Sequence, residues 1–254
     1  MLVKTLLFGL TIALSGFAFA DSKVGDEVTG QLQIGERTFA LPPGKWAVVA
    51  EAETGLSTAI GNSVSTQNKR QYLVLKDTEG KFLAAALIGT TLASSAVQIW
   101  NDTTCDRNDT LFKDTSEATI RMPTCHLINH TVNFWGGNKP QNDFDKAIWQ
   151  WYRDNKVVLP YNVVGSTYVR FFSGDFVRTT FWFNPEAVGL VDKDKKVWAE
   201  SPWHKDNIKS SPDMQSFIDQ VKLWSQAMIK NVKATLVNGK PIDATLPSLP
   251  GVKS

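Results

Sequence analysis

The first 20 residues decide where this chain folds and how much of it belongs to the folded protein. Met1–Lys4 is a short start with one positive charge, and residues 5–20 are mostly apolar. The run ends at Ala18–Ala20, with small residues at the two positions that a signal peptidase reads. It is about 16 residues long, shorter than the roughly 20 that a bilayer-spanning helix needs. We therefore expect a cleavable signal peptide over residues 1–20 and a mature, periplasmic or secreted protein that begins at Asp21.

The chain contains two cysteines, Cys105 and Cys125. An even number of cysteines in an oxidising compartment favours a disulfide, and this one would close a loop of about 20 residues and stabilise the fold by about 3 kcal/mol. The spacing matches no zinc-binding pattern, and there is no third cysteine. The sequence therefore predicts a Cys105–Cys125 disulfide and no metal site.

Charge and hydropathy exclude some classes of partner. The formal net charge is +2, which gives no bulk attraction to nucleic acid, and no run of Lys or Arg marks a membrane-surface patch. Residues 21–254 hold no second long apolar run, so we expect no membrane insertion after signal cleavage. A hydrophobic content of 43% is enough to bury a sizeable core.

Short segments of β-branched, aromatic and alternating apolar residues predict strands. Turn residues such as Pro42-Pro43-Gly44 separate them. Residues 101–124 are rich in Asn, Asp and Thr, and we expect a long loop there. The expected strands cover residues 31–34, 38–41, 46–53, 71–76, 81–88, 126–134, 167–172 and 176–183.

Two later segments carry helical periodicity. Residues 142–155 begin with a capping asparagine and form one apolar stripe. Residues 211–238 begin with serine and proline, keep an apolar stripe for more than five turns, and end before Gly239. We expect a helix over each segment.

Strands come first and two helices come late, without regular alternation. This order predicts an α+β fold with a largely antiparallel sheet and both helices packed on one face. We expect one globular domain over residues 21–240 and an extended C-terminal tail over residues 241–254. The chain resembles the PsbP/Mog1-like α/β sandwiches in its element order, its early Leu41–Trp46 stretch (LPPGKW) and its long late helix. This resemblance implies a sheet covered by helices.

The loop over residues 101–124 has oxygen ligands at the spacing of an EF-hand calcium loop. Leu111 occupies the position where such a loop needs glycine, and Lys113 lies inside it. A solvated loop tied down by the disulfide is the alternative interpretation. Three Asn-x-Thr sequons in this region would matter only in eukaryotic secretion, and the sequence leaves bacterial or eukaryotic origin open. The candidate calcium ligands are Asp106, Asn108, Asp114 and Glu117.

No motif for catalysis stands out. His126 and His130 lie four residues apart, as in zinc peptidases, but in a strand they would be about 13 Å apart, too far for one metal ion. The chain has no Gly-x-Ser-x-Gly motif and no phosphate-binding loop. A pair of catalytic carboxylates needs no local motif, because its members meet only in the folded chain. The residues favour a non-enzymatic protein and leave a hydrolase open.

The hairpin over residues 167–183 offers a candidate binding face. A three-residue loop would place Arg170 and Arg178 on one face among aromatic side chains, whereas the commoner two-residue loop would place them on opposite faces. Two guanidinium groups on one face favour an anion between them, and exposed aromatic rings can stack on a sugar or anchor a partner. The candidate ligand-binding residues are Tyr168, Arg170, Phe172, Arg178, Trp182 and Trp203.

Together these features predict an exported, non-enzymatic binding or envelope-accessory protein whose partner is a small ligand, a glycan or an envelope protein. The alternative is a secreted hydrolase whose site is assembled only in three dimensions. A deep pocket with two carboxylates about 5–10 Å apart would favour the hydrolase, and an aromatic face would favour binding.

Overall fold

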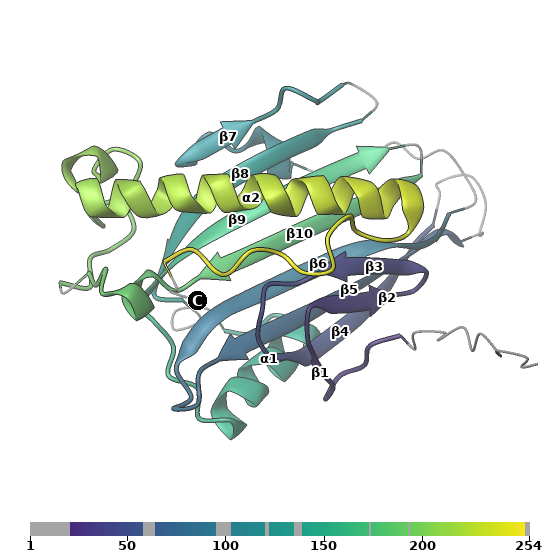
Figure 1. Ribbon diagram of the computed structural model, residues 1–254, viewed down its shortest axis with the longest axis horizontal. Coiled ribbons are helices and arrows are strands. Elements are labelled where there is room, and N and C mark those ends of the chain that lie inside the picture. Colours follow the sequence, from purple (N-terminus) through teal and green to yellow (C-terminus); the bar gives the residue numbers. More distant parts are fainter. Residues whose placement is uncertain are drawn as a thin grey trace, which may run out of the picture.

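The computed structural model describes residues 21–57, 64–94, 103–119, 122–134, 139–172, 174–192 and 194–251, so the expected signal peptide lies outside the described residues. Its centre is an eight-stranded antiparallel sheet with the order β1-β4-β5-β6-β10-β9-β8-β7 (Figure 1). The strands are β1 (Glu27–Val28), β4 (Trp46–Ser57), β5 (Val64–Lys76), β6 (Phe82–Ser94), β7 (Phe112–Asp114), β8 (Thr124–Val132), β9 (Asn162–Phe172) and β10 (Asp175–Phe183).

The sheet consists of two halves that come from separate parts of the chain. Strands β4, β5 and β6 pair in chain order, and β7, β8, β9 and β10 pair in chain order on the other side. The halves join where β6 pairs with β10, from Thr90 opposite Val177 to Ala84 opposite Phe183. Strand β7 lies within the segment predicted as a loop, and it adds an edge strand to β8.

Both predicted helices are present. Helix α1 (Asp143–Asp154) is capped by Asn142, whose Oδ1 accepts a hydrogen bond of 2.9 Å from the backbone N–H of Asp145. Helix α2 (Pro212–Asn238) has proline in its first turn and ends at Gly239, which has a φ of 74° and donates its N–H to the carbonyl of Thr235. The α+β class with a largely antiparallel sheet is confirmed.

The expectation that both helices pack on one face is wrong, because α1 and α2 cover opposite faces of the sheet (Figure 1). Along β6, Ala84, Ala86 and Ile88 face the core that contains α2, whereas Ala85 and Leu87 face the core that contains α1. The centre of the sheet is apolar on both sides, and a strand of this kind needs a cover on each face.

The α2 side of the sheet carries two further elements. A small hairpin of β2 (Gln31–Ile34) and β3 (Arg37–Ala40) lies beside α2, and residues 241–251 run between the hairpin and the helix (Figure 1). These last residues form neither helix nor strand, yet Leu246 and Leu249 are buried in the core. Three short 3-10 helices complete the described fold, η1 (Thr104–Asp106), η2 (Pro185–Val188) and η3 (Ile208–Ser210).

Candidate functional site

The predicted disulfide is present and shapes the α1 side of the sheet. Cys105 on η1 and Cys125 on β8 are bonded, with 5.6 Å between their Cα atoms. The bond holds η1 against the sheet, and Cys125 packs there with Val169 and Phe171 of β9. Thr104, the neighbour of Cys105, is thereby placed next to the side chain of Arg178.

The two hairpin arginines lie on opposite faces of the sheet, as the commoner two-residue loop implies, so the alternative of a shared face is excluded. Two residues connect β9 to β10, and the register pairs Asp175 with Phe172 and Arg178 with Val169. Because side chains alternate along a strand, Arg178 points to the α1 side and Arg170 to the α2 side. Arg170 pairs there with the carboxylate of Glu117, at 3.2 Å.

A second arginine, Arg70, lies on the same face of the sheet as Arg178, two strands away. Arg70 on β5 lies opposite Gly89 on β6, and Gly89 lies opposite Arg178 on β10. The three residues form a row across three neighbouring strands on the α1 side, and the backbones of the two arginines are about 10 Å apart. We call this the Arg–Gly–Arg row.

A cavity of about 210 Å³ lies over the row. A Cβ built on Gly89 would be 3.4 Å from Cβ of Arg70 and 3.8 Å from Cζ of Phe176, so the missing side chain leaves the space between the arginines open. Among the described residues that line the cavity, none is a carboxylate. The lining residues are Thr54, Asn68, Lys69, Arg70, Leu87, Gly89, Phe176 and Arg178.

Aromatic and polar groups position the two arginines. The guanidinium of Arg70 lies over the ring of Phe144 on α1, with Cζ 4.3 Å from the ring centroid. Nη2 of Arg178 donates a hydrogen bond to Oγ1 of Thr104. Asn68, which is 7% exposed, has a buried Oδ1 that accepts no hydrogen bond from the described residues. A buried acceptor of this kind is costly until a donor reaches it.

The other candidate binding residues lie elsewhere. Trp203 is fully buried and packs edge-on against Phe217, so its ring is part of the core and presents no binding surface. Tyr168 is buried in the core on the α2 side, and the side chain of Phe172 lies outside the described residues. Trp182 is on the α1 side, where it packs against Tyr72 with 5.8 Å between ring centroids. Among the five candidates whose side chains are described, only Arg178 lines the cavity.

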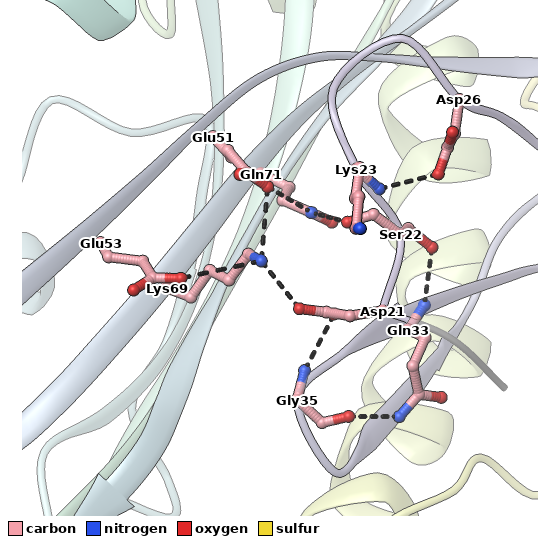
Figure 2. Close-up of polar contacts among 10 residues, drawn as sticks. All are labelled: Asp21, Ser22, Lys23, Asp26, Gln33, Gly35, Glu51, Glu53, Lys69 and Gln71. Carbon is pink, nitrogen blue, oxygen red and sulfur yellow. Dashed lines mark hydrogen bonds and ion pairs between the residues drawn. The ribbon is translucent and has the colours of Figure 1, made fainter. Parts of the chain in front are cut away.

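Lys69, which precedes Arg70 on β5, is surrounded by carboxylates (Figure 2). Lys69 is 6% exposed, and its Nζ lies 2.8 Å from Asp21, 3.3 Å from Glu51 and 3.8 Å from Glu53. Burial lowers the pKa of Lys69, but the hydrogen bonds and charges of Asp21 and Glu51 outweigh it, so the pKa is raised above 10.5. This cation is matched by carboxylates of the chain itself.

The same cluster fixes the first residues of the expected mature chain. Besides the ion pair with Lys69, Asp21 accepts a hydrogen bond of 3.1 Å from the N–H of Gly35. The N–H of Ser22 donates to the carbonyl of Gln33 at 3.2 Å. Figure 2 shows the hydroxyl of Ser22 accepting from the N–H of Gln33 and the carbonyl of Ser22 accepting from Gln71. Asp21 and Ser22 are therefore parts of the tertiary structure.

The candidate calcium ligands have other partners. Glu117 contacts Arg170 and Lys233, and the carboxylate of Asp114 accepts from the N–H of Ser116 at 2.9 Å. Within the described ranges, no group of three His, Cys, Asp or Glu side chains could hold a metal ion. The calcium hypothesis gains no support and stays a prediction.

One arrangement has the order of groups found in a catalytic triad. Asp114 lies opposite His126 across β7 and β8, and Nε2 of His126 is 3.0 Å from Oγ of Ser166. Ser166 is fully buried, and its Oγ is 2.7 Å from Oγ of Ser225, which donates to the carbonyl of Val221. A hydroxyl inside the core cannot reach a substrate, so this chain of groups supplies no nucleophile.

Comparisons with known protein families, with curated proteins and with solved structures found no match.

No helix in the described part of the chain is long and apolar enough to span a membrane.

Sequence reasoning missed Arg70 and Gly89, the other two members of the row. Neither residue belongs to a local motif, because the row joins strands whose pairing is set by the whole sheet. Gly89 within an apolar strand carried the only local signal, since a glycine there often marks close approach of another group.

Proposed function

We propose that this protein is an exported, non-enzymatic binding protein that holds a small hydroxylated organic acid, such as a sugar acid, on the Arg–Gly–Arg row. The observation that carries the proposal is the pair of arginines, Arg70 and Arg178, that flank Gly89 and both line one cavity of about 210 Å³. Guanidinium groups bind carboxylates, phosphates and sulfates through paired hydrogen bonds.

The rest of the cavity favours an organic ligand with donors of its own. Phe176 and Leu87 supply apolar walls that a bare inorganic ion would leave uncovered. The buried Oδ1 of Asn68 needs a hydrogen-bond donor, which a ligand hydroxyl provides. A carboxylate next to hydroxyl groups meets both requirements.

Two features support export. The Cys105–Cys125 disulfide is the kind of bond that persists in oxidising compartments. Asp21 and Ser22, which would follow the expected cleavage site, are bonded into the fold. The test is the intact mass of protein purified from its own host: a chain that begins at Asp21 is expected, and a chain that retains residues 1–20 would overturn export by cleavage.

The binding proposal is tested by calorimetric titration with galacturonate, phosphate, sulfate and neutral galactose. We expect galacturonate to bind and galactose not to bind. Arg70→Gln and Arg178→Gln should each weaken binding at least about tenfold, which corresponds to about 1.4 kcal/mol. Arg153→Gln, at an exposed position on α1, is the matched control and should bind as the wild type does. No saturable binding by any of the anions, or equal binding by all variants, would overturn the proposal.

A further inference from the structure

A second cationic cavity lies on the α2 side of the sheet, at the edge strand β7. Lys222, Lys230 and Lys233 of α2 are eight and three residues apart, so they fall on one face of the helix over about 16 Å. The cavity between this face and β7 has a volume of about 580 Å³. Its lining residues are Phe112, Lys113, Asp114, His126, Lys222, Gln226, Ile229, Lys230 and Lys233. We call it the lysine groove.

The groove keeps a cationic excess after its internal contacts are considered. Its described lining has four lysines and one carboxylate, Asp114, which already accepts a backbone hydrogen bond. Lys233 contacts Glu117 just outside the lining, and Lys222 lies over the ring of Phe112 with Nζ 4.2 Å from the centroid. A cation held by a ring keeps its full charge, so it still attracts an anion.

His126, one of the residues that line the groove, carries a hydrogen-bond acceptor on its ring. Ser225 donates to the carbonyl of Val221, so it accepts from Ser166, and Ser166 in turn accepts from Nε2–H of His126. This chain assigns the proton to Nε2 and leaves Nδ1 of His126 as an acceptor. Burial lowers the pKa of His126 to about 4, which keeps the ring neutral at pH 7.

We infer that the lysine groove binds a multivalent phosphate group, either on a free small molecule or as the headgroup of an anionic lipid. Ammonium groups are compact point charges without the planar fork of arginine, and several can surround one tetrahedral phosphate. A diphosphate places more charge in a cavity of this size than a carboxylate does. The neutral His126, 7% exposed, can accept a hydrogen bond from a protonated phosphate oxygen or a neighbouring hydroxyl.

Calorimetric titration with inorganic pyrophosphate and with citrate tests the chemical class. We expect pyrophosphate to bind more tightly than citrate, and Lys222→Gln/Lys230→Gln to weaken it at least about tenfold. Lys209→Gln/Lys240→Gln removes the same charge at exposed positions outside the groove and should leave binding unchanged. Citrate binding as tight as pyrophosphate binding, or equal loss in both double variants, would overturn the inference.

Sedimentation with phosphatidic acid and phosphatidylcholine vesicles separates the two sources, because phosphatidic acid carries a phosphate monoester that can hold two negative charges. Binding to the anionic vesicles that the groove variant loses would assign the lipid headgroup, and binding to pyrophosphate alone would assign a free phosphate compound. Binding to neither overturns the inference. Arg178→Gln should keep its affinity for pyrophosphate, and a shift of the His126 ring signals in NMR should accompany binding, so this site and the Arg–Gly–Arg row can fail separately.

Discussion

Lys69 and Arg70 are consecutive residues of β5, and their side chains lie on opposite faces of the sheet in different electrostatic surroundings. Lys69 points to the α2 side, where Asp21, Glu51 and Glu53 surround its ammonium (Figure 2). Arg70 points to the α1 side, into a cavity whose described lining has a second arginine and no carboxylate. A cation surrounded by carboxylates of its own chain contributes to the fold, and two guanidinium groups that line one cavity are suited to an external anion.

The largest expected effect is the loss of stability on removing Lys69. Lys69→Met leaves three carboxylates close together without their cation, and it should lower the free energy of unfolding by about 2 kcal/mol. This is less than for a fully buried pair, because Asp21 and Glu51 are 36% exposed. Urea unfolding of the mature protein measures it, with Lys45→Met at an exposed site as the control. A change in the free energy of unfolding below about 0.5 kcal/mol would contradict the structural role of Lys69.

The same cluster predicts a dependence on alkaline pH. The pKa of Lys69 is raised above its ordinary 10.5, so the folded state holds this proton more tightly than the unfolded chain. Its contribution to stability is complete below pH 10.5 and is lost as the pH rises through the raised value. The difference in unfolding free energy between wild type and Lys69→Met should therefore be equal at pH 7 and pH 9 and shrink above pH 10.5. A difference that already shrinks between pH 7 and pH 9 would contradict the assignment.

Gly89→Ala tests the opening between the arginines. The added methyl group meets ordinary contact distances, so the fold should keep its stability or gain up to about 1 kcal/mol. The methyl would occupy the space above the row, and galacturonate binding should weaken by about tenfold, or about 1.4 kcal/mol. Thermal unfolding and calorimetric titration of the same sample separate the two effects. Unchanged affinity would show that the ligand does not use this opening.

The smallest expected effect is that of Arg70→Gln on stability. The variant loses the contact with Phe144 and also the repulsion from Arg178, so the free energy of unfolding should change by less than about 1 kcal/mol. Urea unfolding beside Lys69→Met gives the contrast directly. A loss as large as that of Lys69→Met would make Arg70 a structural residue and weaken the binding proposal.

Local chemistry was enough to predict much of the fold. Asn142, Pro212 and Gly239 mark helix ends by their own conformational preferences, and the two cysteines predict their own bond. The opposite placement of the helices was readable in principle from β6, whose residues 82–88 are apolar on both faces.

The site was much harder to predict, because it depends on register. A difference of one residue in the hairpin loop decides whether Arg170 shares a face with Arg178. The Arg–Gly–Arg row further requires the pairing of β6 with β10, residues about 90 positions apart in the chain, and no local pattern specifies such a pairing.

The junction of the two sheet halves has a consequence for folding. Arg70 and Gly89 belong to the first half and Arg178 to the second, so a bound anion would bridge the junction at which β6 pairs with β10 from a distant part of the sequence. Long-range pairing of this kind is the slow step in assembling a sheet. A ligand that binds only when β6 and β10 are paired would therefore slow the opening of this junction. Ligand binding should slow hydrogen exchange of the amides in β6 and β10 far more than exchange at the sheet edges.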